Sequence, residues 1–434
     1  MLTLKLAFRG LWRHRMRTLF TLIAVAFGHL FLLVSVSLSE GGLMEMVEIA
    51  IRQGTAGHVV VQAEGYQKSG AVELIVEDGE AVRKKIRQRL GRGHLLLRAF
   101  GGGLVTSASD SVGIRFAGVE PQPERRVSEL ARRLKRGVYL GATGDQVDAA
   151  EKRLKKKGAL HCARQVAAGD AAPHPVVIGT QLAKTLRVDL CDGITIQAQG
   201  LGAQEQLKLR VVGIFYTGNQ NLDGYYANIT LTDARRLLRL GTGVHQVAVI
   251  LPSQKGSAAA ARTVRAALGK DGSLDVLTWD KAMPEMAEFI AMKKSTGFVF
   301  ILIVVVIMAI GVLNTVLMSV MERVREFGVM RALGAGPGRI LALVLTEGAL
   351  LGAIGVILGV VISLPLIHYL ETTGIVYPKP LEAAGVSVQA IKAKLELGTL
   401  IAYSLGLFLT TVVASLTPAL RAARVHVLKA VHQA

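Results

Sequence analysis

Few side chains in this sequence have the types and spacing that enzymatic chemistry requires. The phosphate-binding motif G-x-x-x-x-G-K-[ST], the nucleophile motif G-x-S-x-G, the zinc motif H-E-x-x-H and the redox motif C-x-x-C are all absent. The segment GAGPGR at 334–339 resembles a phosphate-binding loop, but it lacks the lysine, and its Gly and Pro content is typical of a turn. We therefore predict no catalytic residue, no metal site and no cofactor bound by this chain.

Four isolated residues remain as candidates for chemistry. His29 lies inside an apolar stretch, where it is either a functional group or a hydrogen-bond partner of a neighbouring helix. Glu347 could carry a proton or pair with a nearby cation. Cys162 and Cys191 could form a disulfide in an oxidising compartment, although their spacing alone does not decide this. Metal or nucleophilic chemistry is disfavoured for both cysteines, because His161 is their only ligand-like neighbour.

The elements that must position these residues are strongly apolar. The chain has 434 residues, of which 51% are hydrophobic and 19% are charged, and its mean hydropathy is +0.42. This composition excludes collagen-like, disordered and disulfide-framework classes and indicates a membrane protein with a large polar domain. Four stretches are long enough to cross a bilayer as helices, at 18–39, 296–320, 340–370 and 398–420. The first is too long for a signal peptide, and no cleavage site follows it.

The basic residues near these spans predict their orientation. Residues 1–17, 321–339 and 421–434 contain five, four and three Lys or Arg, respectively. Cytoplasmic flanks of membrane spans are enriched in Lys and Arg. We therefore expect the amphipathic N-terminal segment 1–17, the loop 321–339 between spans two and three, and the tail 421–434 to be cytoplasmic. The short loop at 371–397 and the large domain at 40–295 then lie on the periplasmic side.

The large domain is predicted to be α+β, since strand-like runs of β-branched residues alternate with helical patterns. It contains 36 Lys and Arg against 26 acidic residues. That surplus indicates either a solvated basic surface or an anionic partner such as lipid headgroups. The orientation disfavours a nucleic-acid partner. The least ordered part is expected at 141–175, which could be a partner-binding loop or a tolerated insertion.

Glycine recurs along one face of the third span. Gly348, Gly352, Gly355 and Gly359 follow one another at steps of four, three and four residues. Such a strip lets another helix approach closely, because lipid provides no hydrophobic drive for association. We therefore predict a helix-packing face.

The loop at 321–340 alternates apolar and charged residues and should form a short amphipathic helix at the cytoplasmic surface, where a membrane anchor is one possible role. Its sequence E-R-x-R-E-F-G-V-M-R-A-L-G-A, at 322–335, resembles the signature of the MacB/FtsX-like permease superfamily, and in particular its lipoprotein-releasing (Lol-type) branch. The resemblance continues at 7–28, 57–66, 116–121, 176–196, 211–224 and 417–431. Three departures are Phe327, where the family usually has Ile, the segment 141–175, which is longer than is common in the family, and the C-terminal VHVLKAV.

The resemblance implies a type VII ABC permease with four transmembrane helices, which works with a second permease copy or paralogue. ATP and Mg would bind to a separate cytoplasmic ABC ATPase dimer, and stalk helices at 40–53 and 280–295 would carry its movement to the periplasmic domain. The loop then corresponds to the coupling helix that contacts the ATPase, with the candidate residues Glu322, Arg323, Arg325, Glu326, Phe327, Met330, Arg331, Leu333, Gly334 and Ala335.

The same resemblance favours a function in the bacterial inner membrane: extraction of lipoproteins from the outer leaflet and delivery to a periplasmic carrier. Acyl chains would enter between spans one and two, where the candidate lining residues are Phe27, Phe31, Leu32, Phe298 and Ile301. One alternative is MacB-type efflux with a periplasmic adaptor, which is disfavoured because only 17 residues precede the first span. The other is FtsX-like activation of a cell-wall hydrolase, which is disfavoured because the domain is large.

Overall fold

The computed structural model describes residues 7–9, 15–91, 93–155, 158–168, 174–269 and 272–424. Parts of three predicted segments, 1–17, 141–175 and 421–434, therefore lie outside the described residues. The chain forms two compact units. One comprises Met1–Met44, Ile290–Val376 and Ala390–Ala434, and the other comprises Glu45–Phe289 and Tyr377–Gln389. We call them the membrane unit and the ectodomain.

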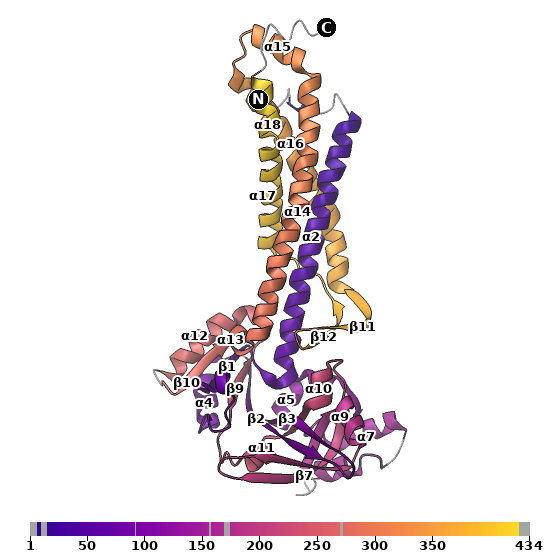
Figure 1. The fold of residues 1–434 in the computed structure, drawn as a ribbon, viewed down its shortest axis with the longest axis vertical. Helices are drawn as coiled ribbons and strands as arrows, with labels where there is room; N and C mark the ends of the chain where they lie inside the picture. Colours follow the sequence, from indigo (N-terminus) through magenta and orange to yellow (C-terminus); the bar gives the residue numbers. More distant parts are fainter. Residues whose placement is uncertain are drawn as a thin grey trace. The chain divides into compact units, whose positions relative to one another are not determined.

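Four helices long and apolar enough to cross a membrane form the membrane unit, as the sequence predicted. They are α2 (Arg15–Ala50), α14 (Pro284–Glu322), α16 (Pro337–Thr372) and α17 (Leu397–Ala414), the last followed by α18 (Leu416–Ala423). Figure 1 shows these helices running side by side. A helix satisfies its own backbone polar groups, which a bilayer requires of any spanning segment. Helices α2 and α14 both include residues of the ectodomain unit, and the π-helical turn Ile51–Thr55 follows the end of α2.

The ectodomain is a mixed sheet covered by short helices. Ten strands form the sheet, with the order β10-β1-β9-β2-β3-β8-β5-β7-β4 and with β6 paired to β2 and β7. The pairs β3–β8 and β5–β7 are parallel, whereas β2–β3 and β6–β7 are antiparallel. The strands are β1 (Val59–Ala63), β2 (His94–Thr106), β3 (Ser111–Val119), β4 (Leu134–Gly137), β5 (His174–Gly179), β6 (Gly193–Gln199), β7 (Gln204–Phe215), β8 (Tyr226–Thr230), β9 (Gln246–Ile250) and β10 (Leu274–Thr278).

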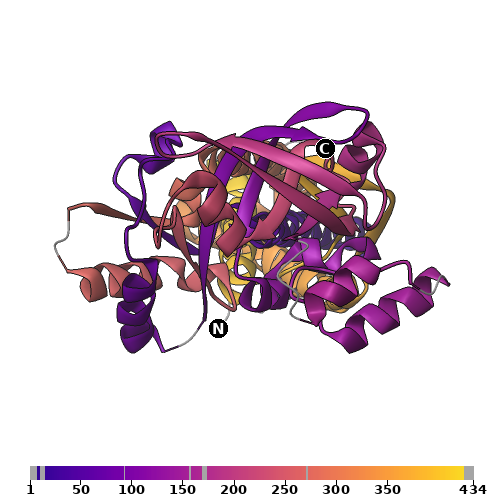
Figure 2. The ribbon, with the colours of Figure 1, turned by 90° about the horizontal axis from the view of Figure 1, so that it is seen from below.

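Helices pack on this sheet through apolar faces. Figure 2 shows α4 and α12 lying side by side at one end of it. The core joins aliphatic residues of the strands, such as Val59 and Leu97, to Ile86 of α4 and Val264 of α12. The ectodomain helices are α3 (Tyr66–Ser69), α4 (Gly79–Leu90), α5 (Pro121–Val127), α6 (Glu129–Arg132), α7 (Gly144–Leu154), α8 (His161–Ala167), α9 (Thr180–Leu186), α10 (Gln220–Tyr225), α11 (Leu231–Leu238), α12 (Ser257–Leu268) and α13 (Trp279–Ala282).

Two segments have more structure than the sequence indicated. The predicted insertion 141–175 contains α7 and α8, and a capping box between Thr143 and Gln146 starts α7. Cys162 of α8 is disulfide-bonded to Cys191, which closes this part of the chain onto the ectodomain.

The loop between spans three and four was expected only as a connection, but it contains the hairpin β11 (Ile375–Ala383) and β12 (Val386–Ile391). Its turn residues Ala384 and Gly385 have φ values of 47° and 75°, as a two-residue hairpin turn requires. The tip of the hairpin belongs to the ectodomain, where Asn219 donates to the Gly385 carbonyl.

Candidate functional site in the membrane unit

The loop that connects spans two and three folds as the short helix α15 (Val324–Ala332). Two backbone hydrogen bonds end this helix, from Gly334 N to Arg331 O and from Ala335 N to Met330 O. Gly334 has a φ of 91°, a conformation that glycine adopts readily at helix C-termini. Pro337 then begins α16. The GAGPGR segment is thus a turn between two helices and does not form a phosphate-binding loop after a strand.

Arg323 connects α15 to the neighbouring helix α16. Its Nη1 donates to Glu347 Oε1 of α16 at 2.7 Å, and its Nε donates to Glu326 Oε2 at 3.0 Å. Its guanidinium also lies 5.2 Å from the centroid of the Phe327 ring, and Phe327 is fully buried. Glu347 therefore pairs with a cation, which was one of the two roles considered for it.

Other residues of the loop remain accessible. Arg325 is exposed, and so are the apolar side chains of Val329 and Leu333, the latter with 83% of its surface accessible. Their spacing of four residues places all three on one helix face. We call Arg325, Val329 and Leu333 the outer face of α15. Apolar side chains left exposed on a charged helix are typical of a docking surface.

The ten candidate coupling residues thus divide into three groups. Arg323 and Phe327 are buried in their own chain and are positioned to hold α15 rather than to contact a partner directly. Glu322 accepts from Arg17 of α2 at 2.7 Å, and Arg331 donates to the Ala423 carbonyl of α18 at 3.5 Å. The third group is Arg325, Glu326, Met330, Leu333, Gly334 and Ala335, and the coupling role of all ten residues stays a prediction.

The glycine strip of α16 contacts two different helices. A β-carbon at Gly348 would overlap the side chain of Ser415, and one at Gly352 would overlap that of Thr411 in α17. On the same strip, a β-carbon at Gly355 would lie 2.6 Å from Val25 Cγ1 of α2, and one at Gly359 would lie 2.8 Å from the His29 side chain. His29, which is fully buried, also lies 3.2 Å from Ser404 Oγ of α17. Close packing in this unit therefore depends on the absence of side chains at these glycines.

An apolar groove of about 970 Å³ runs between α2 and α14. Arg17 and Glu322 join the two helices at one end, and the rings of Phe31 and Phe300 lie 6.0 Å apart near the other. Thr21 donates to Thr315 at 3.1 Å between these points. The lining side chains of α2 and α14 are Met16, Arg17, Phe20, Thr21, Ala24, Val25, Phe27, Gly28, Phe31, Val304, Ile307, Met308, Gly311, Val312 and Thr315.

The groove includes only part of the predicted cavity lining. Phe27 and Phe31 line it. Leu32 and Ile301 instead pack together in a separate apolar cluster, and Phe298 is exposed outside the lining. The prediction missed Phe20 and Ala24, which precede Phe27 and Phe31 at helical spacing. That periodicity could have identified them.

Comparisons with known proteins find similarity to ABC transporter permeases. The family described as FtsX-like permease C-terminal matches residues 298–427. The chain is 22% identical over 264 residues to the lipoprotein-releasing system transmembrane protein LolC of Neisseria meningitidis, which covers 59% of this chain and 57% of the relative. It is also 44% identical over 68 residues to the ABC transporter permease YtrF of Bacillus subtilis, or 15% of this chain and 16% of the relative. The chain thus spans little more than half the length of the LolC relatives that it matches.

Two solved ectodomains are also similar. The extracellular domain of the transporter YknZ from Gram-positive bacteria has 12% identity and a TM-score of 0.33, with 51% of this chain and 98% of that chain covered. The periplasmic region of MacB from Actinobacillus actinomycetemcomitans has 14% identity and a TM-score of 0.33, with 53% and 92% covered.

Proposed function

Because this chain belongs to the FtsX/MacB-like family of ABC transporter permeases, we propose that it is the permease subunit of an ATP-driven transporter that extracts lipoproteins from the outer leaflet of the inner membrane. It would pass them to a periplasmic carrier by mechanotransmission. The similarity to LolC supports this proposal over the wider family function, since LolC is named for lipoprotein release.

The groove between α2 and α14 is the observation that carries the proposal. Its walls are mainly aliphatic and aromatic, and from Met16 to Phe31 it extends over about 22 Å of helix at 1.5 Å per residue. An extended acyl chain fits that length and polarity. We place its entrance at the Phe31 end, because the Arg17–Glu322 ion pair joins the helices at the opposite end.

Energy would reach this groove from a cytoplasmic ABC ATPase dimer docked on the outer face of α15. ATP and Mg would bind to that ATPase, and this chain would act without a cofactor or catalytic residue of its own. A second permease copy or a paralogue would complete the membrane part. In this arrangement both termini are cytoplasmic and the ectodomain is periplasmic.

Release from proteoliposomes tests the proposal. The chain is reconstituted with its ATPase and a fluorescent triacylated lipoprotein, and ATP-dependent transfer to a soluble carrier is measured. Ala24→Trp, which fills the groove, should abolish transfer, whereas Val361→Trp, at an exposed apolar position of α16 outside the lining, should not. Equal transfer by both variants would contradict the role of the groove.

Export of small molecules is the second candidate. The macrolide export protein MacB of Campylobacter jejuni is 38% identical to this chain over 84 residues, which cover 19% of the chain. Transport of a soluble macrolide by the same proteoliposomes, without lipoprotein release, would favour this alternative.

Alkaline phosphatase fusions test the orientation. A fusion at Gly144 should be active and one after Arg339 inactive, because the enzyme folds only in the periplasm. The reverse pattern would reject the proposed topology.

A further inference from the structure

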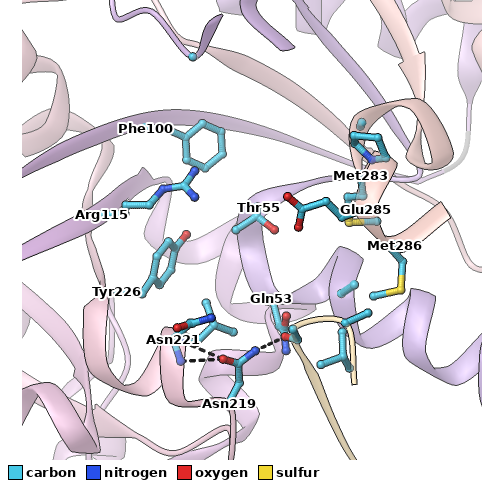
Figure 3. Close-up of a pocket in the computed structure, with 18 of the residues that line it drawn as sticks. Gln53, Thr55, Phe100, Arg115, Asn219, Asn221, Tyr226, Met283, Glu285 and Met286 are labelled. Carbon is cyan, nitrogen blue, oxygen red and sulfur yellow. Dashed lines mark hydrogen bonds between the residues drawn. The ribbon is translucent and has the colours of Figure 1, made fainter. Parts of the chain in front are cut away.

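The ectodomain contains a pocket of about 540 Å³ that the proposed transport function does not use. Residues from the end of α2, the strands β1, β2 and β3, the start of α14 and the tip of the β11–β12 hairpin line it. All of these residues belong to the ectodomain unit. Figure 3 shows the side chains converging on the pocket from these elements.

Two opposite charges face this pocket. Arg115 of β3 and Glu285 in the first turn of α14 both line it. Figure 3 shows them on opposite sides, each directed towards the centre, with Thr55 between them. Neither side chain forms an ion pair with any residue in the described ranges. Both charges are therefore available to a ligand.

Two buried polar atoms in the lining also lack partners. The Tyr226 hydroxyl and the Gln62 carbonyl oxygen have no hydrogen-bond partner among the described residues, although both side chains are buried. Burial raises the pKa of Tyr226, so its hydroxyl keeps the proton and acts as a donor. Buried polar groups are nearly always satisfied in folded proteins, and an unsatisfied pair that faces a cavity indicates a missing ligand group.

Buried polar interactions hold the backbone around the pocket in place. Arg98 and Glu124 form a fully buried ion pair at 2.7 Å, and Arg98 also donates to the Ala56 carbonyl beside Thr55. On the other side, Asn219 Oδ1 accepts from the Asn221 backbone N–H at 2.8 Å while its amide donates to the hairpin tip. A site held in this way binds with little loss of conformational entropy.

We propose that this pocket binds a short peptide through its charged ends. The ligand's carboxylate pairs with Arg115 and accepts a hydrogen bond from Tyr226, its ammonium group pairs with Glu285, and an amide N–H of a peptide donates to Gln62. A zwitterionic lipid headgroup carries similar charges, but it has no amide to satisfy Gln62. This site goes beyond the proposed function and does not depend on it.

Binding to the full-length chain in nanodiscs provides the test. A mixture of alanyl dipeptides is titrated by native mass spectrometry and calorimetry, alongside the same dipeptides N-acetylated and C-amidated, and phosphoethanolamine. The free dipeptides should bind saturably and the blocked ones at least tenfold more weakly. Arg115→Met and Tyr226→Phe should each weaken binding at least tenfold, whereas Arg262→Met, at an exposed arginine of α12, should not.

Tyr226→Phe separates binding from folding. It removes only an unpartnered hydroxyl, so the melting temperature should stay the same or rise while binding weakens. Unchanged dipeptide affinity in both Arg115→Met and Tyr226→Phe would overturn the proposal, and so would the absence of dipeptide binding at about 1 mM, the weak end of specific recognition. Tighter binding of phosphoethanolamine than of any dipeptide would overturn the peptide assignment in favour of a lipid headgroup.

Discussion

The guanidinium of Arg323 lies 2.7 Å from the carboxylate of Glu347, with side chains that are 10% and 6% exposed. This ion pair connects the residue that precedes α15 to the interior of α16. A buried pair of this kind is costly to break, because removal of one partner leaves the other charge buried without compensation. It therefore fixes α15 against α16, as the proposed coupling role of α15 requires.

Glu347→Gln should release α15 while keeping the size of the side chain. Because Arg323 would retain only the more exposed Glu326 as an ionic partner, we expect the free energy of unfolding to fall by about 2 kcal/mol. ATP hydrolysis by the partner should become uncoupled from transport. Denaturant unfolding in detergent and the ratio of ATP hydrolysed to lipoprotein released measure the two effects.

Glu322→Gln is the matched control, because it breaks the more exposed pair with Arg17. Such pairs contribute less than about 1 kcal/mol. If Glu347→Gln has no larger effect than this control, the buried pair does not position α15.

Gly352→Leu should disrupt the contact between α16 and α17. The new side chain would occupy the space of Thr411, and overpacking of this kind typically costs about 1–3 kcal/mol. A lower melting temperature and a broader elution profile in detergent are expected. Gly406→Leu is the control, because no atom lies within 4 Å of a β-carbon at that position. Wild-type stability of Gly352→Leu would count against the packing face.

The ectodomain should lose stability as the pH falls below the ordinary histidine pKa. His245 is fully buried, its Nδ1 accepts from the Phe100 amide at 2.9 Å, and its Nε2 donates to the Val72 carbonyl at 3.0 Å. Burial lowers the pKa of His245 below the ordinary histidine value of 6.5. The unfolded chain therefore binds the proton more readily, and the stability contribution of His245 is complete above pH 6.5 and decreases below it.

Amide exchange measures this effect at one site. The Phe100 N–H should exchange faster at pH 5.5 than at pH 7.5, after correction for intrinsic exchange, by up to about tenfold per pH unit. His245→Gln should flatten that dependence. An identical pH dependence in the variant would show that another group titrates.

The four glycines of α16 illustrate what a sequence pattern can predict. Their phase on one helix face indicated close packing, but it could not indicate that Gly352 contacts α17 while Gly355 contacts α2. That division depends on the order of the helices around α16, which no local pattern encodes. The same limit applies to the groove. The periodicity along α2 indicates which face of α2 lines it, but the opposite wall comes from α14, which is distant in the sequence.

The coupling loop and the ectodomain show which structural features the sequence pattern could not predict. The motif identified α15, but the burial of Phe327 and Arg323 depends on residues of α16. The spacing of Cys162 and Cys191 left their disulfide open, because loop length does not determine which elements meet. The pocket that contains Arg115 and Glu285 was missed entirely, since these residues are far apart in the sequence.

Photo-crosslinking at Leu333 tests the central claim most directly. A photoreactive residue placed there in cells should capture a cytoplasmic ABC ATPase, because Leu333 is the most accessible apolar side chain of the outer face. The same residue placed at Arg239, on the ectodomain surface, should capture no ATPase. An ATPase adduct from Leu333 alone is the predicted result. No adduct from Leu333, or an equal adduct from Arg239, would contradict the account of this chain as a permease driven through α15.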